Sequence, residues 1–186
     1  MGNVVVGATM SLDGFIAGPN DAMDWVFAYS DDLDAPNKID EYIIQSTGAV
    51  LVGRRCYDVG QRAARPELSG LYGGRWVGPE FVLTHRPPVG GSSSRTTFLS
   101  GDIRQAVATA LEAANGKNLL VLGGNVVSQC LDADLVDEVL LHLAPILLGE
   151  GVQMFSRSGQ RQITLETVNA TQVGQLTDLH FRVSRS

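Results

Sequence analysis

Short apolar runs alternate along the chain with segments whose apolar positions recur every three or four residues. The runs are rich in Val, Ile and Leu, which is typical of strands buried in a sheet. The intervening segments carry helix-start signals, such as Asp34 and Pro36 ahead of Ile39 and Ile43. We therefore expect strands at 3–10, 49–53, 80–84, 96–99, 118–122 and 135–148, and helices at 32–47, 54–60, 100–116 and 123–133.

The pattern changes near the C-terminus. Residues 162–172 and 175–184 alternate apolar with polar side chains, the period of a strand with one exposed face. We expect these two segments to pair as antiparallel strands. Strands that alternate with helices and end in such a pair predict an α/β fold: a mostly parallel sheet, helices on both faces and an antiparallel edge. The length of 186 residues fits one domain over 1–186.

The composition narrows the choice of partners. A net charge of −6 and a pI of about 4.9 argue against nucleic acid and anionic membranes as ligands. Cys56 and Cys130 have neither zinc-ligand spacing nor the pattern of a disulfide framework. No apolar run is long enough to span a membrane, and the first residues do not resemble a signal peptide. We expect a cytoplasmic protein without a metal, whose anion-binding sites are built locally.

Two glycines mark the junction of a strand and a helix in the segment 119–131, LLVLGGNVVSQCL. A helix N-terminus presents unpaired N–H groups and the positive end of the helix dipole, and glycine lets an anion approach them closely. Gly123 and Gly124 could equally serve a turn that needs a positive φ. The glycine pair alone leaves both interpretations open.

Two other predicted strands end in groups that bind anions. Arg54 and Arg55 stand in the first turn of a helix, where positive charge opposes the helix dipole unless an anion is bound. The strand at 80–84 ends in a hydroxyl and basic groups, namely Thr84, His85 and Arg86. In an α/β sheet, ligands bind at the carboxyl ends of the strands. Three such ends predict a polyphosphate ligand, such as an adenine dinucleotide with a 2′-phosphate.

The first strand leads into SLDGFIAGPNDAMDW, a segment rich in turn residues. Asp13 and Asp24 are candidates for proton transfer, and Trp25 could lie against a bound ring and exclude water. Asp13 could equally be a turn residue of its Asp-Gly pair, and Trp25 a core anchor.

Four segments together resemble the dihydrofolate reductase superfamily and, within it, the reductase domain of bacterial riboflavin biosynthesis. ATMSLDGFIAG is similar to the first strand and loop, AVLVGRRCY to the Gly-Arg segment, and FVLTHR to the strand whose end meets the 2′-phosphate of NADPH. LLVLGGNVVSQCLDADLVDEVLLHLAPILLGEG combines the Gly-Gly turn, the LVDEV strand entry, the AP within the strand and the LGEG turn. The resemblance covers nearly the whole chain and implies a three-layer fold around one sheet of about eight strands.

This resemblance implies an NADPH-dependent reductase that transfers hydride to a C=N or C=O bond. The implied cofactor residues fall into three groups. They are Ala8, Ile16 and Gly18 at the nicotinamide, Gly123, Gly124, Asn125 and Val126 at the pyrophosphate, and Gly53, Arg54, Arg55, Thr84, His85 and Arg86 at the adenosine side.

The substrate side departs from the family pattern. The riboflavin-pathway reductase usually has Lys where this chain has Phe15 and Glu where it has Leu122, and its Asp-Pro-Arg-type segment is not found here. The acidic residue that follows the Trp in dihydrofolate reductase would fall near Ser30, with Asp31 and Asp32 just beyond it. The catalytic candidates are therefore Asp13, Asp24 and Asp31, and the substrate-binding candidates are Trp25, Arg62 and Arg65.

Three functions stay open at this point. The first is an NADPH-dependent reductase of a small heterocycle of pterin or pyrimidine type. The second is a riboflavin-pathway reductase of 5-amino-6-(5-phosphoribosylamino)uracil, whose phosphate would need the arginines of the loop 61–78. The third is a nucleotide-binding protein without catalysis. The resemblance also implies a homodimer, with the apolar run 135–148 as a candidate interface strand.

Overall fold

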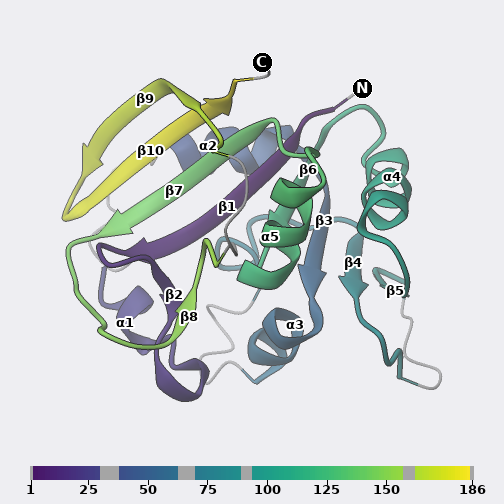
Figure 1. Ribbon diagram of the computed structural model, residues 1–186, viewed down its shortest axis with the longest axis horizontal. Coiled ribbons are helices and arrows are strands. Elements are labelled where there is room, and N and C mark those ends of the chain that lie inside the picture. Colours follow the sequence, from purple (N-terminus) through teal and green to yellow (C-terminus); the bar gives the residue numbers. More distant parts are fainter. Residues whose placement is uncertain (1, 30–37, 63–69, 89–93, 157–161, 185–186) are drawn as a thin grey trace.

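The computed structural model describes residues 2–29, 38–62, 70–88, 94–156 and 162–184. An eight-stranded sheet forms its centre, in the order β5-β4-β3-β6-β1-β7-β10-β9 (Figure 1). Its strands are β1 Val4–Ser11, β3 Thr47–Gly53, β4 Glu80–Leu83, β5 Thr96–Leu99, β6 Asn118–Leu122, β7 Glu138–Ala144, β9 Leu165–Val173 and β10 Leu176–Val183. The helices are α1 Asp24–Phe27, α2 Lys38–Ser46, α3 Arg54–Gln61, α4 Ile103–Ala113 and α5 Gly124–Asp132, with a 3-10 turn at Pro19–Asp21.

The sheet is parallel from β5 through β7 and antiparallel at the C-terminal edge. Parallel pairing joins β5 to β4, β4 to β3, β3 to β6, β6 to β1 and β1 to β7. The last two strands, β10 and β9, pair antiparallel with β7 and with each other. The predicted α/β fold with an antiparallel edge is therefore confirmed.

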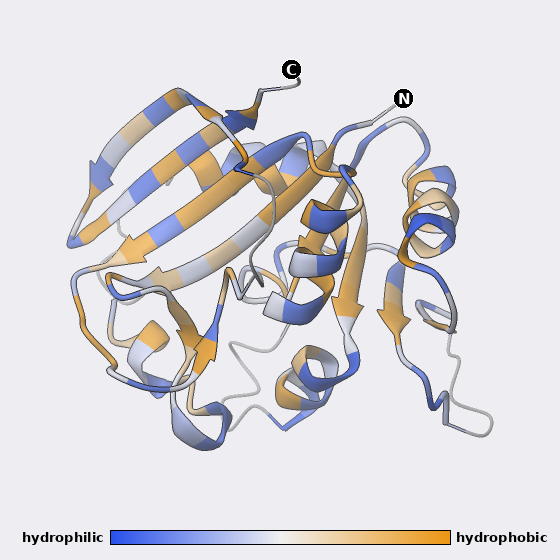
Figure 2. Cartoon of the chain, in the orientation of Figure 1, coloured by the Kyte–Doolittle hydropathy of each residue, from blue (hydrophilic) through white to orange (hydrophobic). Residues whose placement is uncertain are grey.

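Alternate residues of the buried strands pack on opposite faces of the sheet. Val4 and Val6 belong to the core that α4 and α5 cover, and Val5 belongs to the core that α2 covers. Figure 1 shows α4 and α5 in front of the sheet and α2 behind it. Figure 2 shows the central strands as nearly continuous apolar ribbons, as expected where helices cover both faces.

Several predicted boundaries move in the structure. The helix expected at 32–47 is described from Lys38 to Ser46, Thr47 already belongs to β3, and Asp34 lies outside the described residues. The strand expected at 135–148 is shorter, because β7 ends at Ala144 and Pro145 has no N–H for a further ladder bond.

The prediction that the apolar run 135–148 supplies an interface strand is wrong. Both edges of β7 are hydrogen-bonded within the chain, to β1 on one side and β10 on the other. Its apolar sequence reflects burial inside the chain's own sheet, as the exposure of Val139, Leu140 and Leu141 at 5% or less shows.

Two segments that the sequence predicts to be turns contain short strands in the structure. β2 Phe15–Ala17 pairs antiparallel with β8 Val152–Gln153, which brings the segment after β1 against the segment after β7. Three-residue and two-residue strands are too short to leave a period in the sequence. This ribbon, at the lower left in Figure 1, forms one wall of the candidate site.

Candidate functional site

A cavity of about 510 Å³ opens at the carboxyl ends of β1, β3, β4 and β6. Its volume is in the range of small-molecule and cofactor sites. Most of the residues expected to hold the cofactor line it: Ala8, Ile16, Gly53, Arg54, Arg55, Thr84, His85, Gly123, Gly124, Asn125 and Val126. Residues from four strand ends, far apart in the sequence, are thus brought together as the sequence predicted.

Gly123 serves the turn considered above, and Gly124 serves a close packing of backbones that the sequence did not predict. Gly123 has a φ of 90°, so it needs glycine for its conformation. Gly124 is packed closely, because a Cβ there would overlap the backbone oxygen of Gln153. This contact places α5 directly against β8, with the first turn of α5 at the cavity wall.

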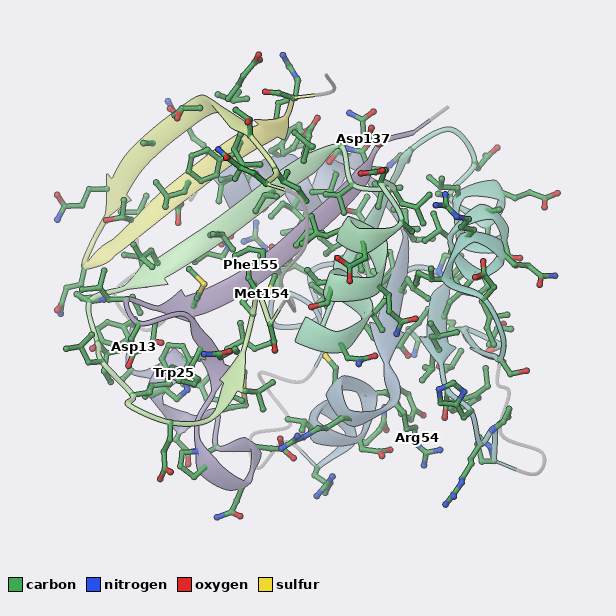
Figure 3. The ribbon with its side chains drawn as sticks, in the orientation of Figure 1. Asp13, Trp25, Arg54, Asp137, Met154 and Phe155 are labelled. Atoms are coloured by element: carbon green, nitrogen blue, oxygen red, sulfur yellow. The ribbon has the colours of Figure 1, made fainter. Side chains whose placement is uncertain are left out.

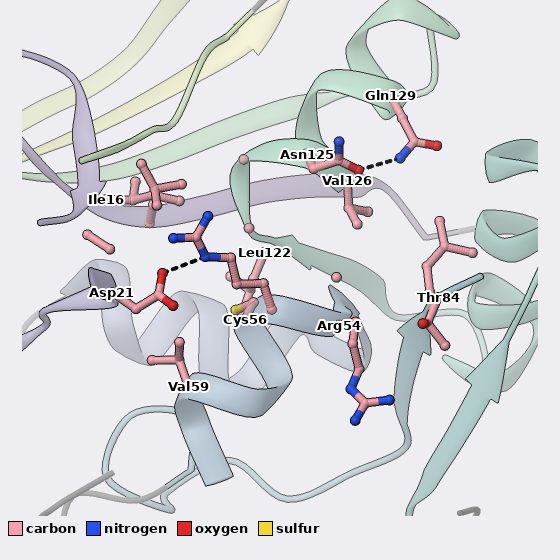
Figure 4. A pocket seen from close by; sticks show the side chains of 18 of the residues that line it. Ile16, Asp21, Arg54, Cys56, Val59, Thr84, Leu122, Asn125, Val126 and Gln129 are labelled. Atoms are coloured by element: carbon pink, nitrogen blue, oxygen red, sulfur yellow. Dashed lines mark hydrogen bonds and ion pairs between the residues drawn. The ribbon is translucent and has the colours of Figure 1, made fainter. Parts of the chain in front are cut away.

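The start of α5 has no capping side chain, because its N-cap residue is Gly123. The unpaired N–H groups and the helix dipole therefore favour an anion at this point. Asn125 and Val126, from the first turn, line the cavity, and the Asn125 side chain accepts a hydrogen bond from Gln129 at 2.7 Å (Figure 4).

The two arginines of α3 are held by different carboxylates. Arg54 Nε donates to Asp58 at 2.8 Å, and its guanidinium lies 5.9 Å from the centre of the Phe98 ring. Arg55 Nε donates to Asp21 at 2.5 Å, across the cavity (Figure 4). Arg54 and Arg55 are 41% and 65% exposed, so both keep donors available to a ligand.

The end of β4 adds a hydroxyl and an imidazole to the cavity. Thr84 and His85 line it, whereas Arg86 does not. The Arg86 N–H donates to Thr84 Oγ1 at 3.1 Å, and its carbonyl oxygen accepts a long hydrogen bond of 3.5 Å from Arg54. Arg86 therefore supports the site through its backbone.

Part of the cavity wall is apolar. Ala8 and Ile16 line it together with Met23, Val26 and Val59, as expected where an uncharged ring binds. Gly18 is displaced from this wall and lines an adjoining polar groove instead.

The two catalytic candidates that the structure describes, Asp13 and Asp24, are not in the cavity wall. The third candidate, Asp31, lies outside the described residues. Asp13 joins two loops: it accepts a hydrogen bond of 2.6 Å from Ser11 Oγ, and bonds of 3.1 and 2.7 Å from the N–H groups of Leu148 and Gly149. The turn interpretation of Asp13 is therefore the one that the geometry supports.

We expect Asp13→Asn to weaken the fold near neutral pH and to leave nucleotide affinity within about twofold. Hydrogen bonds from Ser11 and Gly149 lower the pKa of Asp13 below its ordinary 3.8. A lowered folded-state pKa means that this contribution to stability is present above about pH 4 and disappears as the pH falls through the folded pKa. Melting temperature measured against pH checks this: the variant should lose part of the acid dependence. Undiminished stability with lost turnover would contradict it.

Two of the three substrate-binding candidates, Trp25 and Arg62, lie in the described part of the chain. Trp25, labelled in Figure 3, has a buried indole nitrogen without a hydrogen-bond partner among the described residues. Its neighbour Val26 lines the cavity. Arg62 is not in the cavity wall and donates to the Asp58 carbonyl at 3.1 Å. Arg65 lies outside the described residues.

Sequence reasoning missed several residues of the wall. Asp21 and Gln129 supply polar groups there, and Cys56 lies against Gly123. Burial raises the pKa of the Cys56 thiol to about 11, so it stays protonated at neutral pH. Asp21 follows a Gly-Pro-Asn turn, but only the fold shows that it faces Arg55.

These residues fit NADPH. The uncapped start of α5 and the guanidinium of Arg55 suit a pyrophosphate, Arg54 with Thr84 and His85 suits a 2′-phosphate, and the apolar part of the wall suits a nicotinamide. Among the described residues, no group of three or more His, Cys, Asp or Glu side chains is arranged to hold a metal ion. In the same part of the chain, no helix is long and apolar enough to cross a membrane.

Known proteins resemble this chain over most of its length. The model of the RibD C-terminal domain matches residues 3–179. YyaP of Bacillus subtilis strain 168, itself uncharacterised, is 28% identical over 172 residues, which cover 89% of this chain and 86% of YyaP.

Two solved structures share the fold. A putative riboflavin biosynthesis protein from Shewanella sp. PV-4 has a TM-score of 0.79 at 22% identity, covering 98% of this chain and 99% of that one. A diaminohydroxyphosphoribosylaminopyrimidine deaminase/5-amino-6-(5-phosphoribosylamino)uracil reductase from Thermotoga maritima has a TM-score of 0.68 at 16% identity, covering 98% of this chain and 57% of that one. At these identities the likeness concerns the fold.

Proposed function

Because the chain belongs to the RibD C-terminal domain family, we propose that it is an NADPH-dependent reductase of a small heterocyclic compound. The observation that carries this proposal is the convergence of Arg54, Arg55, Thr84 and the uncapped start of α5 on one cavity whose wall is partly apolar. NADPH, when bound, would supply hydride for a C=N or C=O bond. The chain's own residues would hold the phosphates and exclude water from the apolar part of the cavity.

A pyrimidine of the riboflavin pathway is the second candidate substrate. The Thermotoga relative named above is a reductase of such a compound, which favours trying it. Of the arginines that we expected at its phosphate, Arg62 does not support it further, since Arg62 is outside the cavity wall.

The proposal is tested by following NADPH oxidation with a panel of acceptors. The panel contains 5-amino-6-(5-phosphoribosylamino)uracil, the same compound without its phosphate, and a dihydropterin. We expect turnover of at least one acceptor with NADPH and much slower turnover with NADH. Tight NADPH binding without turnover of any acceptor would favour the non-catalytic nucleotide-binding protein instead.

We also propose a homodimer, with the outer edge of β9 as the strand that meets the second copy. β9 pairs only with β10 in the described part of the chain, and Leu165 and Val168 are 40% and 46% exposed. Its single charged residue is Glu166, so the edge lacks the Lys and Pro that usually protect an edge strand. Sedimentation should give a dimer mass, and Val168→Lys should give a monomer. A monomeric wild-type chain would contradict this.

The reducing cytoplasm stays the expected location. Cys56 and Cys130 are both free thiols, as proteins of that compartment usually have.

A further inference from the structure

An ion pair joins two walls of the cavity. Arg55, in the first turn of α3, donates from Nε to Asp21 Oδ1 at 2.5 Å, and Asp21 ends the 3-10 turn that follows β2 (Figure 4). Both residues line the cavity. Arg55 also lines the adjoining polar groove, as do Gly124 and Asn125 of α5. The ion pair therefore stands where the cavity, the groove and the first turn of α5 meet.

The carboxylate of this pair is the more enclosed partner. The side chain of Asp21 is 19% exposed, whereas that of Arg55 is 65% exposed. Arg55 thus reaches from a more open position onto a carboxylate that belongs to the cavity wall. The ligand-free protein therefore holds an anionic group on the guanidinium that suits a pyrophosphate.

The turn that carries Asp21 is closed by its own backbone. The Gly18 N–H donates to the Ala22 carbonyl oxygen at 2.9 Å, and the Ala22 N–H donates to the Pro19 carbonyl oxygen at 3.2 Å. Asn20 and Asp21 have φ values of 56° and 64°, in the left-handed region that Asn and Asp adopt more readily than other side chains. The Asp21 side chain can therefore rotate away from Arg55 while the turn stays closed.

Positive charge in the cavity wall is scarce. As far as the described residues form it, the wall contains two arginines, Arg54 and Arg55, and no lysine. A guanidinium carries one positive charge, so a carboxylate and a phosphate on Arg55 together would leave net negative charge in a partly enclosed space. Like charges that share one cation repel each other more strongly there than in open water. A phosphate therefore binds Arg55 best after Asp21 has left it.

We propose that Asp21 is an internal counter-ion of the nucleotide site, which holds Arg55 while the cavity is free and yields it to the pyrophosphate of NADPH. This rests on the proposed function, because it takes the cavity to be the nucleotide site. A contact that exists only in the free protein is lost on binding and so opposes it. Asp21 thus lowers the affinity of the site for ligands that carry a pyrophosphate.

The neighbouring arginine supplies a matched control. Arg54 Nε lies 2.8 and 3.0 Å from the two carboxylate oxygens of Asp58, which is on the same helix and outside the cavity wall. Asp58→Asn removes one negative charge from an arginine of the site but no anion from the wall. Asp21→Asn keeps the shape of the side chain and suits a left-handed backbone. Since Arg55 is largely exposed, its lost ion pair should change the melting temperature little.

The first test is a calorimetric titration of the wild type, Asp21→Asn and Asp58→Asn with NADPH and with inorganic pyrophosphate. Asp21→Asn should bind both about threefold to tenfold more tightly than the wild type, and Asp58→Asn should stay within about twofold. Equal or weaker binding of either ligand by Asp21→Asn, or an equal gain in Asp58→Asn, overturns the inference. NADPH binding by the wild type would then still support the nucleotide site. Absence of binding of both ligands to all three proteins would overturn the inference and the proposed function together.

The second test follows the Nε–H group of Arg55 in nitrogen-15 spectra of arginine-labelled protein. Arg55→Lys identifies the signal by removing it. Without ligand, the signal should differ between the wild type and Asp21→Asn, because the carboxylate acceptor is present in the wild type alone. With saturating NADPH, this difference should largely disappear, because phosphate has taken the place of Asp21 in the wild type. A difference that persists in the NADPH complexes shows that Asp21 stays on Arg55, and this overturns the inference.

Discussion

Gly124→Ala is expected to lower NADPH affinity at least about tenfold and to lower the melting temperature by several degrees. The new Cβ would overlap the Gln153 backbone oxygen, and a main chain held by the β2–β8 pair cannot move aside without shifting α5. A shift of α5 would move the N–H groups that we propose to hold the phosphates of NADPH. Calorimetric titration with NADPH and a thermal melt measure the two effects.

Gly60→Ala is the matched control, since Gly60 lies in α3 on an ordinary helical backbone, where an added Cβ would meet nothing within 4 Å. Alanine in a helix is more stable than glycine by about 0.5–1 kcal/mol, so this variant should melt slightly higher. The same chemical change thus has opposite effects at the two sites. Unchanged NADPH affinity in Gly124→Ala would contradict the placement of phosphate at α5.

Arg54→Leu is expected to weaken NADPH binding by about 10- to 100-fold and NADH binding by less than about threefold. The reason is that a charge-assisted hydrogen bond to the 2′-phosphate exists only with NADPH. The ion pair of Arg54 with Asp58 is exposed on both sides, at 41% and 34%, so its loss costs little stability. Equilibrium titrations with both nucleotides measure the difference.

Arg62→Leu controls for the loss of a positive charge near the site. Arg62 follows the same helix but is outside the cavity wall and donates only to the Asp58 carbonyl among the contacts described. It should leave both affinities nearly unchanged. Equal losses of NADPH and NADH in Arg54→Leu would remove Arg54 from the 2′-phosphate site.

Much of the cavity wall follows from local sequence. The position of a glycine or an arginine at the end of an apolar run can be predicted from the run itself, because the carboxyl ends of parallel strands all lie at one edge of the sheet. Gly123, Arg54 and Thr84 can therefore be placed on the cavity wall without knowledge of the strand order.

The role of Asp13 could not be predicted from local sequence patterns. Asp13 follows β1 and lies close to the site in sequence, yet the N–H groups that engage it belong to Leu148 and Gly149, which no short-range pattern connects to it. The helix α1 and the strands β2 and β8 are too short for a period, so the sequence does not predict the wall that they form.

The partners of the buried His142 could not be predicted from the sequence either. His142 within an apolar strand is expected to be structural, because a lone histidine on an apolar face usually is. Its partners Asp40 and Asp178 lie on α2 and β10, and only the order of the strands brings them together. Long-range pairing of polar residues leaves no signal in a single sequence.

The most direct test of the cavity as a nucleotide site is a calorimetric titration of the wild-type protein with NADPH and, separately, with NADH. We predict one NADPH bound per chain with micromolar affinity and NADH bound at least about tenfold more weakly. Absence of binding to both nucleotides would contradict this, and Gly123 and Gly124 would then serve only the turn and the packing of α5 against β8.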